Sequence, residues 1–131
     1  MKGRRTKFTV ALLLALILVM TLAVMPAHAG GNKIVVQKYI RADTGGVLRG
    51  GGVTVVIPPN ALPRSAMIAM QVDLDEHEVS FTPDLKFDRP VLVHFAFPVN
   101  GLNFWDRGKW VPVRMVGRTA ILYHFSRYAW W

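Results

Sequence analysis

The sequence contains no cysteine, so no disulfide can cross-link the fold and its stability must come from packing. Serine is scarce, with only Ser65, Ser80 and Ser126 present, and none of them lies in the Gly-x-Ser-x-Gly turn that carries a hydrolase nucleophile. After residue 29 there is no run of basic residues and no apolar pattern of 3.6-residue period long enough for a full helix. These absences exclude a disulfide scaffold, a helical bundle and a continuous nucleic-acid-binding footprint.

The start of the sequence has the pattern of an export signal. A segment with four basic residues is followed by an apolar run, Phe8–Met25. Pro26 ends the run, and Ala27-His28-Ala29 places small residues at the two positions that a signal peptidase reads. We therefore predict a signal peptide over residues 1–29, with cleavage before Gly30.

Retention of this segment as a membrane anchor is the alternative. A helix formed by the 18 residues of the apolar run would measure about 27 Å, which is close to the thickness of a bilayer core. In both cases the basic flank stays in the cytoplasm and the following domain lies outside. The sequence thus predicts a secreted or cell-surface protein that meets a membrane only through residues 1–29.

Half of the formal charge of +8 belongs to the predicted signal peptide, which holds four of the 16 lysines and arginines. Residues 30–131 keep 12 basic and 8 acidic residues, a net charge of +4. Because these charges are scattered, they indicate a solvated surface and no nucleic-acid partner. The 102 residues of this part are enough for one domain with a single core.

Alternating apolar residues predict strands throughout residues 30–131. Lys33–Arg41 and Val53–Ile57 are rich in Ile and Val. In Met67–Leu74 the even-numbered apolar residues alternate with Ala69, Gln71 and Asp73, which is typical of a strand with one buried face. In the next candidate strand, four apolar residues share a face: Val91, Val93, Phe95 and Phe97.

Glycine-containing turns divide the second half of the domain into short strands. Asn100-Gly101 predicts a type I′ hairpin, because both central residues of that turn need positive φ. Further turns are predicted at Asp106-Arg107-Gly108 and at Gly117-Arg118, with strands that start near Leu102, Lys109 and Thr119. A single helical turn is expected at residues 60–62. Short strands with regular turns predict an all-β, antiparallel β-sandwich over residues 30–131.

One stretch of the sequence resembles a known family. Gly45-Gly46 is followed by Val53–Ile57 and then by Pro58-Pro59-Asn60-Ala61-Leu62. This arrangement resembles the ZU-five domain, in which a Gly-Gly pair precedes a strand and Ile-Pro-Pro-Gly-Ala-Leu. Asn60 stands where the family usually has glycine, and asparagine is the next-best residue at positive φ. The resemblance extends over about Val36–Phe97, and implies an antiparallel β-sandwich for protein interaction that uses no cofactor.

The triplet His124-Phe125-Ser126 is the sharpest candidate for chemistry. Some proteins that carry tandem sandwich domains of this family cleave themselves between Phe and Ser of such a triplet. The Ser126 hydroxyl would attack the Phe125 carbonyl carbon, His124 would move the proton, and a strained peptide bond would be required. Alternatively, the triplet has a packing role, in which His124 bonds to the backbone, Phe125 lies in the core and Ser126 caps a turn.

Two other groups of polar residues have competing interpretations. An acidic cluster with one histidine could hold calcium, or it could be a solvated loop between strands; it comprises Asp73, Asp75, Glu76, His77 and Glu78. His94 could pair with His124 across a sheet, but two histidines without a third ligand do not make a zinc site. A buried, hydrogen-bonded His94 is the alternative, and we expect no metal site.

Four tryptophans lie in the last third of the chain: Trp105, Trp110, Trp130 and Trp131. Exposed indole rings could dock a protein partner or stack on the sugars of a cell-wall glycan. Alternatively, Trp105 and Trp110 pair across a hairpin, while Trp130 and Trp131 cover the end of the sandwich.

Taken together, these patterns predict a non-enzymatic interaction or structural module at the cell exterior. The expected partner is an envelope or extracellular protein, or a cell-wall glycan, and the expected binding residues are the four tryptophans. The competing hypothesis is a self-cleaving domain that cuts between Phe125 and Ser126. No cofactor is expected.

Overall fold

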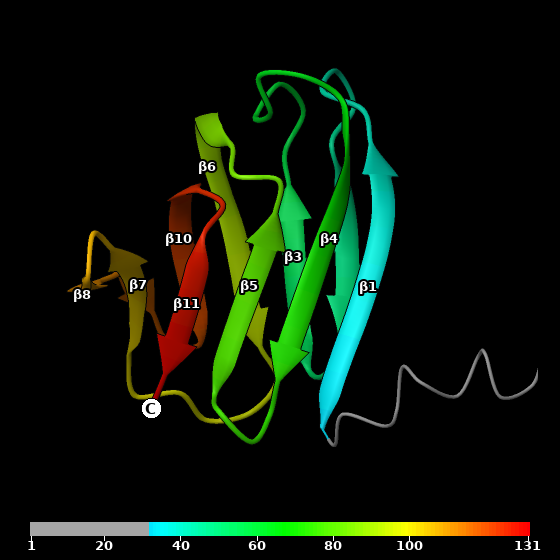
Figure 1. The fold of residues 1–131 in the computed structure, drawn as a ribbon. Helices are drawn as coiled ribbons and strands as arrows, with labels where there is room; N and C mark the ends of the chain where they lie inside the picture. The colour runs from blue at the N-terminus through cyan, green and yellow to red at the C-terminus, as the bar shows by residue number, and fades with distance from the viewer. Residues whose placement is uncertain (1–31) are drawn as a thin grey trace, which may run out of the picture. The chain divides into compact units, whose positions relative to one another are not determined.

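The computed structural model describes residues 32–131, so the predicted signal peptide and the helix expected within it lie outside the described residues. Residues 32–131 form eleven strands and no helix (Figure 1). Each strand pairs antiparallel to its neighbours in two sheets, which confirms the predicted all-β, antiparallel architecture. In this part of the chain no helix is long and apolar enough to cross a membrane.

The larger sheet has six strands in the order β1-β4-β5-β11-β7-β8 and faces the viewer in Figure 1. Its strands are β1 (Lys33–Ile40), β4 (Ala66–Asp73), β5 (Glu78–Thr82), β11 (Arg127–Trp130), β7 (Leu102–Asp106) and β8 (Lys109–Pro112). β11, which follows every other strand in the sequence, lies between β5 and β7. The sheet therefore combines strands from both halves of the domain.

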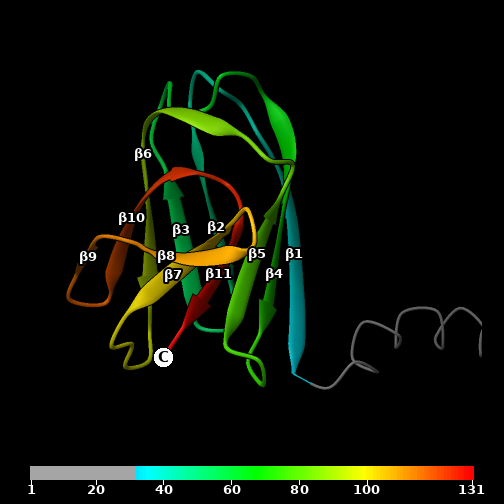
Figure 2. The ribbon, with the colours of Figure 1, turned by 60° about the vertical axis from the view of Figure 1, so that its left-hand side comes forward.

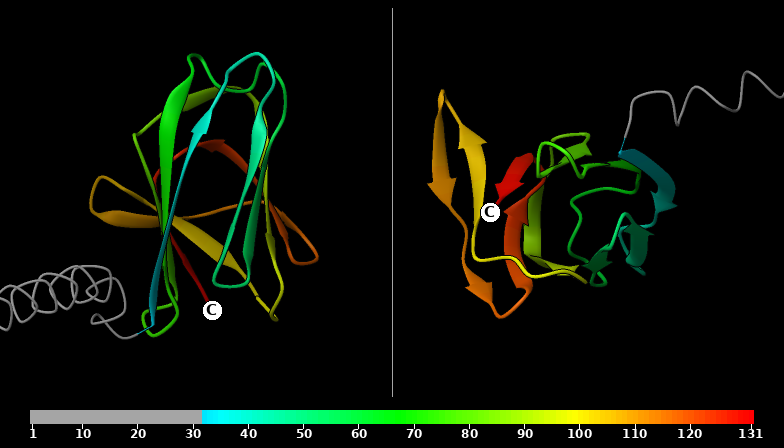
Figure 3. Two further views of the ribbon diagram at one scale, coloured as in Figure 1. Left: turned by 90° about the vertical axis from the view of Figure 1, so that its right-hand side faces the viewer. Right: turned by 90° about the horizontal axis from the view of Figure 1, so that it is seen from below.

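The smaller sheet has five strands in the order β2-β3-β6-β10-β9. Its strands are β2 (Gly46–Gly50), β3 (Val53–Ile57), β6 (Lys86–Phe95), β10 (Thr119–His124) and β9 (Met115–Val116). Figure 3 shows the two sheets as layers that face each other, with β7 and β8 at one end beyond β11. Figure 2 brings the β7–β8 hairpin to the front.

The core lies between the sheets and is built by the predicted alternation. In β4, the side chains of Ile68, Met70 and Val72 are fully buried, while Ala69 and Gln71 point the other way. In β6 the same alternation buries three apolar side chains, Val91, Val93 and Phe95. Leu74 and Phe97, just beyond the two strands, are partly buried against the same core. The predicted buried faces of these two strands are therefore confirmed.

Two of the three predicted hairpin turns are confirmed. β7 and β8 are joined by Arg107 and Gly108, and both have positive φ, at 49° and 84°, as a type I′ turn requires. Gly117, with φ of 59°, lies in the turn between β9 and β10. The strands after these turns begin at Lys109 and Thr119, and β7 begins at Leu102, as predicted.

The predicted hairpin at Asn100-Gly101 is wrong. Neither residue is among the described positions with positive φ, and the segment connects β6 of one sheet to β7 of the other. Gly101 has a different reason to be glycine. A Cβ atom there would lie 2.3 Å from Cζ2 of the Trp131 ring, so the glycine leaves room for that ring.

The segment that carries the family resemblance has the local geometry that its residues predict. Gly45 has φ of 67°, and a Cβ atom there would lie 2.1 Å from the carbonyl oxygen of Ile57. Asn60 has φ of 61°, as expected of asparagine at a glycine position, and its backbone N–H donates to the carbonyl of Ala42 at 2.7 Å. The expected helical turn at residues 60–62 is wrong, because this segment forms a non-helical turn.

Candidate functional site

The triplet lies where the chain crosses from the smaller sheet to the larger one. β10 ends at His124 and β11 begins at Arg127, so Phe125 and Ser126 form the connection. Phe125 is buried, with its ring stacked on Phe81 at 4.7 Å and set edge-on to Phe87 at 4.6 Å. The predicted core position of Phe125 is therefore confirmed.

His124 is held by aromatic neighbours. Its ring meets the ring of Phe104 edge-on, with centroids 4.7 Å apart, and its Nδ1 lies 3.5 Å from the hydroxyl oxygen of Tyr128. The Tyr128 hydroxyl donates to the backbone carbonyl of His124 at 2.5 Å. Burial raises the pKa of Tyr128 well above its ordinary value, so this hydroxyl keeps its proton. No hydrogen bond joins the His124 and Ser126 side chains in the described residues.

Hydrogen bonds hold the two peptide groups that flank the Phe125–Ser126 bond. The Phe125 N–H donates to the carbonyl of Leu85 at 2.8 Å, and the Ser126 carbonyl accepts from the N–H of Phe81 at 3.1 Å. Within residues 32–131, neither positive φ nor a cis peptide bond occurs at residues 124–126. Neither of these two forms of backbone strain is therefore present at the triplet, and self-cleavage remains the competing hypothesis.

Two hollows are both lined by Phe104 and His124. One is an apolar pocket of about 150 Å³ between β7 and β10, which also involves Val113, Ile121 and Tyr128. A cavity of this size holds a single six-membered ring. The other is an open groove whose polar lining includes Asp84, Lys86, Asp106 and Ser126.

The acidic cluster forms the turn between β4 and β5. Asp73 is largely buried, and its carboxylate accepts hydrogen bonds from the backbone N–H groups of Asp75 and Glu76, both at 3.1 Å. His77 has φ of 55° and stacks on Trp130 at 5.6 Å. Among residues 32–131 no group of three or more His, Asp or Glu side chains is placed to hold a metal ion. The acidic cluster is therefore a turn in which backbone N–H groups hold the Asp73 carboxylate.

Both interpretations of His94 need correction. In the pairing of β6 with β10, His94 lies opposite Thr119, whereas His124 lies opposite Lys86, so the two histidines are at different ends of the strands. His94 is also exposed, because its position in β6 faces solvent, although its Nδ1 lies 3.1 Å from the Thr119 hydroxyl. The predicted pairing and the predicted burial are therefore wrong, while the hydrogen bond is confirmed.

Trp105 and Trp110 face each other across the β7–β8 hairpin, as the pairing interpretation predicted. They are register partners next to the two-residue turn, and their ring centroids lie 5.1 Å apart in an edge-to-face arrangement. Both side chains point to the outer face of the larger sheet and remain 41% and 37% exposed. Packing against each other thus leaves much of both rings open to solvent.

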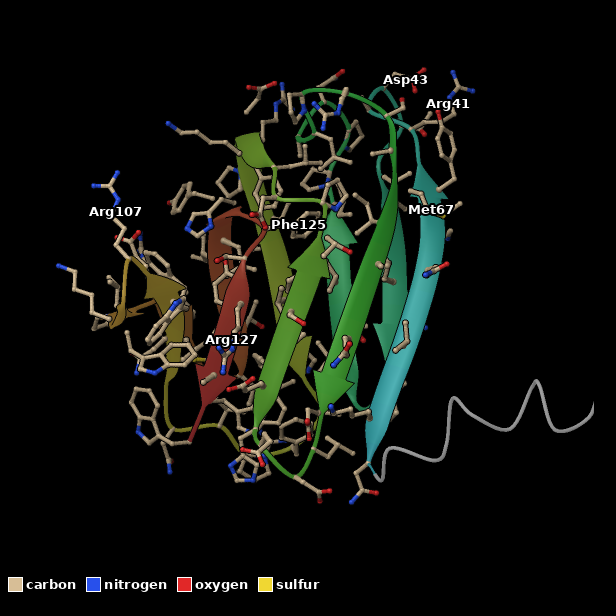
Figure 4. All side chains as sticks on the ribbon, in the orientation of Figure 1. Arg41, Asp43, Met67, Arg107, Phe125 and Arg127 are labelled. Carbon is tan, nitrogen blue, oxygen red and sulfur yellow. The ribbon has the colours of Figure 1, made fainter. Side chains whose placement is uncertain are left out.

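Arg127 of the neighbouring strand β11 completes this surface (Figure 4). Its guanidinium carbon lies 5.9 Å from the Trp105 ring centroid and 5.4 Å from that of Trp110. Glu78 of β5 accepts two hydrogen bonds from the same guanidinium, at 2.6 and 3.1 Å, which raises the pKa of Arg127. We call Trp105, Trp110 and Arg127 the tryptophan patch.

The other two tryptophans lie apart from the tryptophan patch. Trp130 is buried, with ring centroids 5.7 Å from Phe95 and 5.3 Å from Phe97, so its ring belongs to the core. Trp131 is 57% exposed and lies over Gly101. The sequence did not indicate that Arg127 belongs to this surface or that Glu78 holds it. The contact between the two side chains depends on how β11 pairs with β5 and β7. Only the strand register would have revealed it.

The sequence matches no protein-family model and no curated protein.

Proposed function

We propose that this protein is an exported, non-enzymatic binding module that attaches to a component of the cell exterior through the tryptophan patch. The signal-like residues 1–29 support export, and the resemblance of residues 45–62 to a ZU-five domain supports a module that binds rather than one that catalyses. A module that is exported and that binds would attach to an envelope or extracellular macromolecule.

The observation that carries this proposal is the fixed geometry of an exposed patch. Trp and Arg are the residue types that contribute most energy in binding interfaces. Here Arg127 is already held by Glu78 and by two indole rings, so little side-chain entropy remains to be lost when a ligand binds. An exposed surface that is both aromatic and preorganised favours binding as its function.

The test is attachment of the purified domain, residues 30–131, to the isolated envelope of the cells that make it. We expect Trp110→Ala to lower the apparent affinity by at least about ten-fold, as is typical of a residue at the centre of an interface. Leu92→Ala is the matched control, because Leu92 is apolar and 39% exposed but lies on the outer face of the smaller sheet.

Melting temperatures of both variants show whether each still folds. Equal attachment of wild type and Trp110→Ala, with both folded, would contradict the proposal. Loss of attachment in Leu92→Ala alone would move the binding surface to the other sheet and contradict it as well.

A further inference from the structure

The outer face of the larger sheet carries a row with one residue from each of its six strands. Strand register places Val35 opposite Gln71, Gln71 opposite Ser80, and Ser80 opposite Arg127. Because Tyr128 pairs with Phe104, the adjacent Arg127 lies beside Trp105, which in turn faces Trp110. Five strand spacings make this row about 24 Å long. We call it the polar row.

Short side chains occupy the middle of this face. Beside the polar row, Ala69 and Thr82 are opposite each other on β4 and β5, and Ala129 follows Arg127 on β11 by two positions. Figure 4 shows β4 and β5 from this side, with short side chains along both strands. Other long side chains stand at the two ends of the sheet, namely Trp105 with Trp110 at β7–β8 and Tyr39 with Met67 at β1–β4. Gln71 and Arg127 stand among these shorter neighbours, where an extended ligand that crosses the strands would contact them.

Charge along the polar row is nearly absent. Arg127 is its one charged member, and the carboxylate of Glu78 neutralises it at 2.6 Å. The other polar members, Gln71 and Ser80, are uncharged donors and acceptors. A polyanion would find no net positive charge here, so the row matches an uncharged ligand with many hydroxyl groups.

We infer that the ligand of the tryptophan patch is a neutral glycan chain built from pyranose rings with free vicinal hydroxyl groups, which lies along the polar row. This inference rests on the proposed function and names the ligand class of that same site. The C–H groups on a pyranose face carry partial positive charge and meet the negative face of an indole ring at Trp110. The ring hydroxyls donate to Glu78 and Gln71 and accept from Arg127 and Gln71.

The test uses the attachment assay on envelope that has been treated with either proteinase K or periodate. Periodate oxidises vicinal diols of sugars to aldehydes, with cleavage of the carbon–carbon bond and reduction of periodate to iodate. We expect attachment of the wild-type domain to survive proteinase K and to be lost after periodate. Loss after proteinase K, or persistence after periodate, would overturn the glycan inference while leaving the proposed function standing. No attachment to untreated envelope would overturn both.

Variants along the polar row provide a second readout on proteinase-K-treated envelope. Gln71→Ala removes an amide about three strands from the tryptophans, and we expect an affinity loss of about three- to ten-fold, as for one or two hydrogen bonds. Tyr123→Ala is the aromatic control, since Tyr123 is 54% exposed on β10 of the other sheet, and we expect no change. Unchanged binding by Gln71→Ala, or weakened binding by Tyr123→Ala, would overturn the placement of the glycan along the row.

Discussion

Tyr128 couples the stability of the fold to alkaline pH. Its hydroxyl is buried and donates to the carbonyl of His124, and burial raises its pKa above the ordinary value of about 10. A raised pKa in the folded state means that the folded protein holds this proton more tightly than the unfolded chain does. The resulting stabilisation is fully present below pH 10 or so and is lost as the pH rises through the pKa of the folded state.

We therefore expect Tyr128→Phe to unfold with a weaker dependence on alkaline pH than the wild type. At pH 7 the variant lacks one hydrogen bond and should lose about 1 kcal/mol of unfolding free energy. Urea titrations of both proteins between pH 7 and pH 11 measure the difference. Parallel curves over the whole range would show that Tyr128 is not the group that responds.

Ser126 is the residue at which the two hypotheses for the triplet separate. Because hydrogen bonds hold both sides of the Phe125–Ser126 bond and the backbone there has no positive φ, we expect the bond to stay intact. Intact mass under denaturing conditions should then show one species that starts at Gly30 and includes Ser126–Trp131. A species that ends at Phe125, and that disappears in Ser126→Ala, would establish self-cleavage. Denaturation is essential, since a cleaved β11 could remain paired with β5 and β7.

At the scale of single elements, two glycines with positive φ should respond differently to substitution. At Gly108 a new Cβ would meet nothing within 4 Å. Gly108→Ala should therefore lower the free energy of unfolding by about 1 kcal/mol, the cost of holding alanine in the left-handed conformation. At Gly45 the same Cβ would collide with backbone atoms of Ile57 and Pro58, which cannot rotate away. We expect Gly45→Ala to cost at least about 3 kcal/mol.

Thermal or urea denaturation of the two alanine variants measures this difference directly. The pair is matched in residue type and in the sign of φ, so the contrast isolates the collision. Similar losses for both variants would mean that the turn after β1 can move to accept a side chain, which would weaken the case for a fixed segment at residues 45–62.

Strands and turns could be predicted where they depend on residues that are close together in the sequence. The β7–β8 hairpin follows from Arg107-Gly108 and the strand limits of β3 from Val53–Ile57, because turn chemistry and alternation are local. Asn100-Gly101 has the same local signal as a hairpin, yet it spans the two sheets, because Trp131 and β11 decide where it lies. His94 alternates with Val93 and Phe95, so the same alternation that correctly buried their face places His94 on the opposite face, and the expected burial of His94 was inconsistent with it. The tryptophan patch was half predicted: the two rings were expected to pair, while Arg127 required the strand register.

At the scale of the whole molecule, Trp130 at the end of β11 and Trp131 just after it should contribute very differently to the free energy of unfolding. Trp130→Ala removes a buried ring that touches Phe95, Phe97 and His77, and we expect a loss of about 3–5 kcal/mol. Trp131→Ala removes an exposed ring, and we expect a loss below about 1 kcal/mol. Equilibrium unfolding in urea compares the two, and a larger loss for Trp131 would contradict the assignment of Trp130 to the core.

The larger sheet cannot be completed until its last strand in the sequence, β11, is in place. Residues 127–130 are synthesised after every other strand, yet β5 and β7 have no shared neighbour until β11 lies between them. Without β11 the larger sheet consists of two parts, β1-β4-β5 and β7-β8, which are not paired with each other. We therefore expect the complete larger sheet to form only after β11 has been synthesised, an order that is compatible with the export that we propose.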